Sequence, residues 1–237
     1  MRVLVTRPQP DADMTAERLR EIGHTPLVAP LIEIQGLNQA GSLDISGFQA
    51  VLVTSANGAR ALAGATDRRD TQIFAVGAAS AETARQAGFK SVESADGDVG
   101  ALKLLVMECL DPGVGHLLHI TGSVTAGNLA GELRCAGFSV NANQLYQADT
   151  VSTLPTKILD GITQHRIDAM IFFSPRTSRT FMQLVRKAKI LELLNNINVF
   201  CLSEEVRKSL EESYFEDVRV AQRPEQDSLL QLLQMNA

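Results

Sequence analysis

Short apolar runs of strand length alternate with amphipathic stretches along the whole chain. Residues 2–6 (RVLVT), 50–54 (AVLVT) and 169–173 (AMIFF) are each followed by a polar turn and then by apolar positions at helical spacing. Strands that alternate with helices are typical of parallel sheets covered by helices on both faces. The pattern therefore predicts an α/β protein.

The order of these strand and helix units repeats. Residues 49–62 (QAVLVTSANGARAL) align with residues 168–181 (DAMIFFSPRTSRTF), which places Ser55 on Ser174. The chain is thus four units followed by the same four, and we expect two similar α/β domains of about 100 residues each. The other aligned pairs are 71–89 with 197–215, 92–105 with 218–233, and the N-terminal unit through Gly23 with the unit that ends at Gly137.

The repeat is compatible with two divisions into domains. A cut near Asp111-Pro112 gives consecutive domains, whereas a crossed division joins the N-terminal unit to the C-terminal half of the chain. In the crossed division the chain passes between domains at residues 31–35 (LIEIQ) and 145–148 (LYQA). Both segments have an extended pattern and could pair as a two-stranded hinge. Periodicity alone does not decide between the divisions.

Composition narrows the classes of function. An apolar content of 45% with 21% charged residues indicates a globular protein with a packed core. The net charge of −5, without a basic run, argues against a nucleic-acid partner. No uncharged apolar run reaches the roughly 20 residues of a membrane helix, and the apolar run in MRVLVTRPQP is too short for a signal peptide. We therefore expect a cytoplasmic protein without a membrane segment.

The cysteines and histidines form no recognisable metal or disulfide pattern. Cys109, Cys135 and Cys201 are scattered over predicted helices and strands, and we expect them to be small buried side chains. His116 and His119 lie three residues apart on a predicted strand and should face opposite sides of the sheet. We expect no metal.

The loops that follow the predicted strands carry hydroxyl groups, glycines and arginines and few acids. Ligands of open α/β sheets bind beyond the carboxyl ends of the strands, where such loops enter helices. Backbone N–H groups and hydroxyls at these positions suit an anion, although helix capping explains any single loop equally well. The loops begin at Thr6, Thr54, Gly77, Thr121, Ser174 and Ser203.

Familiar catalytic motifs are absent from the sequence. No GxGxxG follows the first strand, and residues 122–127 have phosphate-loop spacing but are followed by Asn128 and Leu129 in place of Lys and Ser or Thr. There is no GxSxG elbow and no HExxH pair. Glu33 and Asp168 are isolated carboxylates. The loops therefore suit anion binding, and the sequence contains no motif for nucleophilic, metal-dependent or hydride-transfer catalysis.

Tyr146 is the one candidate for chemistry. A phenol is protonated at pH 7 and can donate its proton to a leaving hydroxyl. The simpler interpretation is a tyrosine packed at a hinge with its hydroxyl in water.

Together the motifs resemble those of the uroporphyrinogen-III synthase family. The matching pieces are VLVTRP, PLIEI, FQAVLVTSAN, FAVGAASAE, LYQ, DAMIFFSPRT and AQRPEQDSLL, in this order over nearly the whole chain. Each piece is too short to be specific alone, so the resemblance rests on the combination of the pieces and on their order. It implies the crossed arrangement of two flavodoxin-like α/β domains, each a parallel sheet flanked by helices, with the active site in the cleft. The implied domains are residues 1–34 plus 149–237 and residues 37–143, with a two-stranded linker formed by 31–36 and 144–148.

The resemblance also implies a reaction. Family members are lyases that need no cofactor and cyclise hydroxymethylbilane, a linear tetrapyrrole with eight carboxylates. The last ring is inverted through a spiro intermediate, uroporphyrinogen III forms and water is released. Because the unassisted bilane closes without inversion, the protein must chiefly orient the substrate. The implied setting is tetrapyrrole biosynthesis, with hydroxymethylbilane synthase as the upstream enzyme, and we expect a monomer.

Carried over position by position, the resemblance assigns roles to residues. Tyr146 matches the tyrosine proposed in the family to help the hydroxyl leave. Family members often carry Arg-Gly where this chain has Thr121-Gly122, so either a carboxylate contact is lost or Arg60 or Arg179 replaces it. The residues expected to bind substrate are Thr6, Arg7, Thr54, Ser55, Asn57, Gly77, Ser80, Thr121, Gly122, Ser174, Arg176 and Thr177.

Two other classes of protein share a two-lobed α/β plan. One is an anion-binding protein without catalytic activity, which is usually exported. The other is a sugar-nucleotide transferase, which would need acidic metal or base residues that these loops lack.

Overall fold

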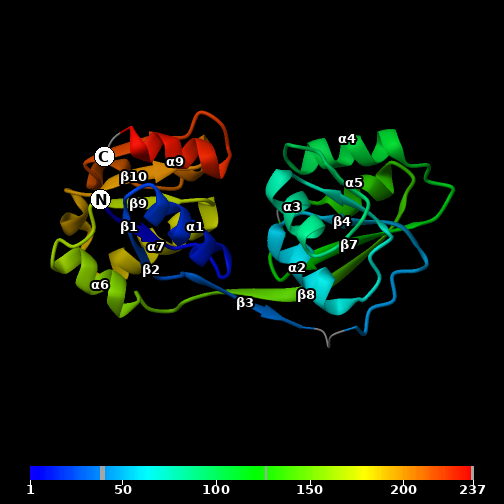
Figure 1. The fold of residues 1–237 in the computed structure, drawn as a ribbon, viewed down its shortest axis with the longest axis horizontal. Helices are drawn as coiled ribbons and strands as arrows, with labels where there is room; N and C mark the ends of the chain where they lie inside the picture. Colours follow the sequence, from blue (N-terminus) through cyan, green and yellow to red (C-terminus); the bar gives the residue numbers. More distant parts are fainter. Residues whose placement is uncertain (38–40, 126, 236–237) are drawn as a thin grey trace. The chain divides into compact units, whose positions relative to one another are not determined.

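The computed structural model describes residues 1–37, 41–125 and 127–235. The chain divides into two compact units (Figure 1). The first unit consists of Met1–Glu33 and Asp149–Ala237, and the second of Ile34–Ala148. None of the helices within the described ranges has the length and apolar character that a membrane span requires.

The first unit is built on a five-stranded parallel sheet with the order β11-β10-β9-β1-β2. Counted from β1 along the unit this order is 2-1-3-4-5, which is the flavodoxin-like order. The strands are β1 (Arg2–Val5), β2 (Thr25–Val28), β9 (Ala169–Phe172), β10 (Asn198–Cys201) and β11 (Asp217–Val220). The helices are α1 (Asp11–Glu21), α6 (Thr156–Thr163), α7 (Pro175–Ala188), α8 (Glu204–Arg207) and α9 (Gln226–Gln234), with 3-10 turns η1 (Leu191–Leu194) and η2 (Glu212–Tyr214).

Both faces of this sheet are buried. On one face, Phe172 of β9 packs against Phe181 of α7, with ring centroids 5.4 Å apart, in the cluster that also buries α6 and α8. On the other face, Val3 and Val5 pack with Leu230 in the cluster that buries α1 and α9. Burial on both faces explains why these strands are continuous apolar runs in the sequence.

The second unit repeats this plan. Its sheet has the order β3-β8-β7-β4-β5-β6, and β8 to β6 follow the same spatial order as β2 to β11 in the first unit. The strands are β3 (Ile32–Gly36), β4 (Phe48–Val53), β5 (Gln72–Ala75), β6 (Val92–Ser94), β7 (His116–Gly122) and β8 (Ser139–Thr150). The helices are α2 (Ala56–Ala65), α3 (Ala78–Gln86), α4 (Val99–Cys109) and α5 (Leu129–Cys135); α2 and α3 bury one core cluster, and α4 and α5 the other.

The linker between the units has two strands. β3 and the long strand β8 are hydrogen-bonded neighbours (Figure 1), and the N–H of Leu37 donates to the carbonyl of Leu145 at 2.9 Å. The predicted fold class, two similar flavodoxin-like α/β domains joined by a two-stranded linker, is confirmed.

The prediction that all three cysteines are buried was wrong. Cys109 and Cys135 are exposed because each is the last residue of its helix; of the three cysteines, Cys201 is buried as expected.

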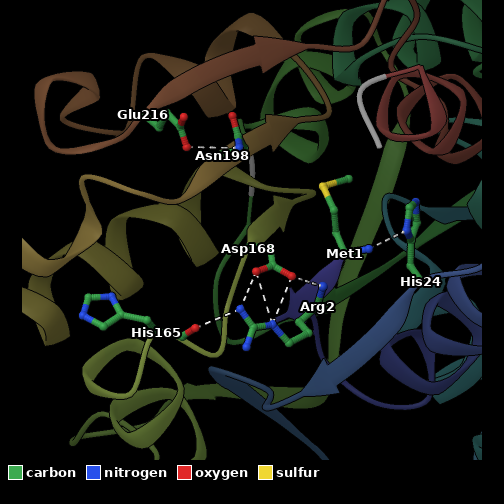
Figure 2. A network of polar contacts seen from close by, with 7 residues as sticks. All are labelled: Met1, Arg2, His24, His165, Asp168, Asn198 and Glu216. Carbon is green, nitrogen blue, oxygen red and sulfur yellow. Dashed lines mark hydrogen bonds and ion pairs between the residues drawn. The ribbon is translucent and has the colours of Figure 1, made fainter.

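A polar network closes the amino-terminal edge of the first sheet (Figure 2). The guanidinium of Arg2 binds the carboxylate of Asp168 and donates to the carbonyl of His165 at 2.8 Å, and the backbone N–H of Arg2 donates to the same carboxylate at 2.6 Å. The N-terminal amine lies 3.2 Å from Nδ1 of His24, and Asn198 donates to Glu216 at 3.4 Å. These contacts tie neighbouring strands together, which accounts for the isolated carboxylate at the start of β9.

We expect Asp168→Asn to lower the free energy of unfolding by no more than about 1 kcal/mol at pH 7, because both partners are more than a third exposed. Hydrogen bonds from Arg2 lower the pKa of Asp168 below its ordinary 3.8. A lowered pKa stabilises the fold above pH 3.8 and ceases to do so as the pH falls below it. Urea unfolding at pH 7 and pH 3 should therefore show a larger difference between variant and parent at pH 7 than at pH 3. An equal difference at both values would contradict an electrostatic origin.

Candidate active site

Tyr146 contacts Ser55 at the carboxyl-terminal edge of the second sheet. Its side chain is 8% exposed, and its hydroxyl lies 3.0 Å from Oγ of Ser55, a residue 91 positions earlier in the chain. Ser55 follows β4, and Tyr146 lies on β8, two strands away across β7. Parallel strands bring these distant residues to one edge, where ligands of α/β sheets bind.

Ser55 is held by its place at the start of α2. Its backbone is extended (φ −161°, ψ 156°), and Oγ accepts a hydrogen bond from the N–H of Gly58 at 2.9 Å. This is an N-cap, and the alanine-rich sequence of α2 favours a helix directly behind it. The cap fixes the Ser55 hydroxyl between a helix N-terminus and the phenol.

A β-bulge sets the position of Tyr146. Thr121 pairs with Gln144, but the next residue, Gly122, pairs with Tyr146, so Leu145 is the extra residue of β8. The extra residue shifts the alternation of β8, and consecutive side chains at 145 and 146 are both buried. Bulges of this kind often redirect a side chain at a functional site.

Gly122 leaves the room that the ring of Tyr146 occupies. A Cβ at this position would lie 2.5 Å from both Cε2 and Cζ of the ring and 2.8 Å from its hydroxyl oxygen. The N–H of Ser123 donates to the carbonyl of Tyr146 at 3.0 Å, and Oγ of Ser123 accepts from the N–H of Ala148 at 3.0 Å. The phenol is thus positioned by backbone contacts on β7 and β8. Ser123 was not among the predicted site residues, because its contacts depend on the bulge.

The other residues predicted for the second unit follow its strands at the same edge. Asn57 lies in the first turn of α2, where its Oδ1 accepts from the guanidinium of Arg60 at 2.7 Å. Gly77 is the N-cap of α3, and Ser80 is buried in the first turn of that helix. Thr54 directly follows β4 and Thr121 lies on β7, and both are half-buried. The structure therefore groups these positions with Ser55, Gly122 and Tyr146 along one sheet edge, while their roles in binding stay predictions.

Ser174 in the first unit repeats the cap of Ser55. Its Oγ accepts from the N–H of Thr177 at 3.2 Å and lies 2.8 Å from the Thr177 hydroxyl. Arg176 is half-buried in the same first turn of α7. Thr6 directly follows β1, and its buried hydroxyl has no hydrogen-bond partner within the described ranges.

Arg7 is engaged within its own unit. Its guanidinium donates to Oε1 of Gln226 at 2.8 Å and to Oγ1 of Thr15 at 3.1 Å, and it lies 3.4 Å from the carboxylate of Asp11. The same group stacks over the ring of Phe173, 4.1 Å from the centroid. These contacts stabilise the loop after β1, and the predicted role of Arg7 in substrate binding stays a prediction.

A cavity of about 370 Å³ at the amino-terminal edge of the first sheet is lined by His165, Asp168 and Asn196 with apolar neighbours, and no predicted site residue lines it. In the part of the chain that the structure describes, no three His, Cys, Asp or Glu side chains gather as they would around a metal ion.

The family follows from a comparison with known proteins. The sequence model of a family described as uroporphyrinogen-III synthase HemD matches residues 13–231. The chain belongs to the uroporphyrinogen-III synthase family. The resemblance found in the short motifs is thereby confirmed. Members of this family are cyclising lyases of tetrapyrrole biosynthesis.

Solved structures agree in fold. The uroporphyrinogen-III synthetase from Helicobacter pylori 26695 is 16% identical, covers 100% of this chain and 99% of its own, and superimposes with a TM-score of 0.65. A mutant uroporphyrinogen III synthase from the extremely thermophilic bacterium Thermus thermophilus is 18% identical over 99% of this chain and 98% of its own, with a TM-score of 0.57. No curated protein sequence matches the chain. At such identities the likeness establishes the fold, and family membership rests on the sequence model.

Proposed function

We propose that the protein cyclises hydroxymethylbilane to uroporphyrinogen III, with inversion of the last ring and release of one water. The observation that carries this proposal is the family match over residues 13–231. The site supports it, since a fixed phenol contacts the capping Ser55 at the N-terminus of α2, and the uncapped N-terminus of α3 follows another strand at the same sheet edge, where its N–H groups suit a carboxylate. Nothing in the described residues favours a pure binding protein or a sugar-nucleotide transferase.

The proposed chemistry needs one proton donor and much orientation. The phenol of Tyr146 donates a proton to the leaving hydroxyl while the C–O bond breaks, water departs, and the pyrrole nitrogen supplies the electron pair that forms the azafulvene cation. This electrophile attacks the substituted carbon of the last ring, and the spiro intermediate opens and recloses with that ring inverted. Folding the bilane so that this carbon is the nearer one is the main task of the protein.

The setting follows from the charge of the substrate. A molecule with eight carboxylates does not cross a bilayer unaided, because burying each charge in hydrocarbon is costly. We therefore place the protein in the compartment of the enzyme that makes hydroxymethylbilane, which we take to be the cytoplasm, and expect it to act as a monomer without a cofactor.

The test is the isomer composition of the product. Hydroxymethylbilane is generated enzymatically, incubated with the protein, and the oxidised uroporphyrin isomers are separated by chromatography. Isomer III should dominate with the protein and isomer I without it. A binding protein or a transferase would leave isomer I alone in both samples, and that outcome would reject the proposed function.

For Tyr146→Phe we expect turnover to fall about tenfold, which is less than the roughly hundredfold minimum typical of a positioned general acid, because the unassisted bilane also loses its hydroxyl. The fold should persist, since the ring stays buried and only one hydrogen bond, to Ser55, is removed. Steady-state kinetics and urea unfolding measure the two effects. An unchanged kcat would remove Tyr146 as the acid.

A further inference from the structure

Three groups of the second unit form a chain of hydrogen bonds that ends at the phenol. The N–H of Gly58 donates to Oγ of Ser55 at 2.9 Å, and the same Oγ lies 3.0 Å from the hydroxyl of Tyr146. Either hydroxyl could be the donor in the second bond. The direction decides whether the phenol proton is tied to the protein or available to a substrate.

The N-terminus of α2 favours donation by Ser55. When the Ser55 oxygen accepts from a helix N–H, its own O–H becomes a stronger donor, and successive bonds that run in one direction strengthen one another. The reverse direction would make this oxygen accept two bonds and leave the serine proton without a partner among the described residues. The cooperative arrangement runs from Gly58 through Ser55 to the phenol oxygen.

The internal repeat shows why this serine is available to the tyrosine. Ser174, the equivalent of Ser55, has the hydroxyl of Thr177 at 2.8 Å, and the position equivalent to Thr177 is Gly58. Because glycine brings no hydroxyl, nothing at position 58 competes for the proton of Ser55. In the first unit the capping serine therefore hydrogen-bonds a hydroxyl of its own helix, whereas in the second unit the equivalent serine hydrogen-bonds Tyr146.

We propose that Ser55 is a positioning residue for Tyr146: its hydroxyl donates to the phenol oxygen, so that the phenol proton points to the substrate. This assigns Ser55 a role other than direct substrate binding and rests on the proposed function of Tyr146. When that proton passes to the leaving hydroxyl, the C–O bond breaks, water leaves and the phenolate oxygen keeps the hydrogen bond from Ser55. The helix N-terminus stabilises the same charge, and the proton that the product releases on regaining aromaticity restores the phenol.

Kinetics of paired variants test this role. Ser55→Ala should lower kcat about three- to tenfold, the value of one hydrogen bond, with little change in KM, and Ser55→Thr should restore most of it. In a Tyr146→Phe background, Ser55→Ala should lower kcat no further. Equal losses in both backgrounds would overturn the proposal, because Ser55 would then act only as a helix cap or as a substrate ligand.

Asp98→Ala is the matched control for the loss of a cap. Asp98 is the N-cap of α4 in the same unit and accepts from the N–H of Ala101 at 2.9 Å. Its removal should lower stability to about the same extent as Ser55→Ala does, while kcat stays at the parent value. A fall in kcat equal to that of Ser55→Ala would show that destabilised caps explain the loss, and would also overturn the proposal.

A spectroscopic test does not depend on activity. The chain has two tyrosines and no tryptophan, so Tyr214→Phe leaves Tyr146 as a single reporter. The tyrosine Fermi doublet in ultraviolet resonance Raman spectra distinguishes a phenol that accepts a hydrogen bond from one that donates. We expect the spectrum to show the loss of an accepted hydrogen bond on Ser55→Ala; the loss of a donated bond, or no change, would overturn the proposal. If the protein made only isomer I, the proposed function would fail while this spectrum could still show the bond.

Discussion

Gly122→Ala is expected to lower kcat at least about tenfold and the free energy of unfolding by about 2 kcal/mol. The new Cβ would lie 2.5 Å from two carbons of the Tyr146 ring, a distance that real contacts do not tolerate, so the ring or the strand must move. The ring cannot yield easily, because it is buried, and because the carbonyls of Tyr146 and of Leu145 before it accept hydrogen bonds from Ser123 and Leu37. Overpacking of this kind typically lowers the free energy of unfolding by about 1–3 kcal/mol. The fall in kcat has a separate cause, which is the displacement of the proposed acid. Isomer III formation and urea unfolding measure both effects.

Gly64→Ala is the matched control. Gly64 lies in α2 of the same unit, and a Cβ there would meet nothing within 4 Å. Because alanine is the better helix former, the free energy of unfolding of this variant should rise by about 0.5–1 kcal/mol, and its kcat should equal that of the parent. If Gly122→Ala had the kcat of the parent, a Cβ at position 122 would not displace the Tyr146 ring. The close contact between Gly122 and the ring would then have no role in catalysis.

The succession of strands and helices could be predicted from the sequence because the central strands of both sheets are buried on both faces. Such strands are apolar runs that recur with the repeat, and the same repeat aligns Ser55 with Ser174, which cap equivalent helices. Helix caps depend on residues three apart, so local sequence contains the required information.

The contacts of Tyr146 could not be predicted in the same way. They depend on the register of β7 against β8, and one extra residue at Leu145 changes which side chain meets Gly122. A bulge has no signature in the apolar pattern of a single strand, because it belongs to a pair. The bond to Ser55 then follows from a sheet order that brings residues 91 positions apart together.

The contacts of Arg7 could not be predicted from the sequence either. An arginine after a parallel strand suits an anion site, and the family resemblance assigns it to substrate. Its partner Gln226 lies at the far end of the chain, and its neighbour Phe173 follows another strand, so no local pattern shows that its guanidinium is already engaged. Long-range side-chain partners are the information that sequence patterns lack most.

His119→Leu is expected to make the protein less sensitive to acid. The imidazole lies on β7, 5% exposed, on the sheet face that packs against α4 and α5, as Leu117 two residues earlier does. Neither ring nitrogen has a hydrogen-bond partner in the described part of the chain. Burial, and to a smaller extent the charge of Arg134, lowers the pKa of His119 from 6.5 to about 4. The native state therefore holds this ring neutral.

The sign of the effect follows from the two pKa values. Above pH 6.5 neither the folded nor the unfolded chain protonates His119, and stability is fully present. Between pH 6.5 and about 4 only the unfolded chain binds the proton, so the parent should lose about 2 kcal/mol from pH 7 to pH 5 through this residue, and about 3 kcal/mol in all. Urea unfolding of parent and variant at both pH values measures the difference.

The difference between the two proteins isolates this residue from the other acid-sensitive groups. His24 also has a lowered pKa, through burial and then the N-terminal charge, and it contributes equally to parent and variant. At pH 7 the variant should be at least as stable as the parent, since leucine fills a similar volume without two unpaired nitrogens. Parallel losses from pH 7 to pH 5 would mean that the parent protonates His119 without unfolding. The ring would then have a partner or access to water that its burial against α4 and α5 excludes.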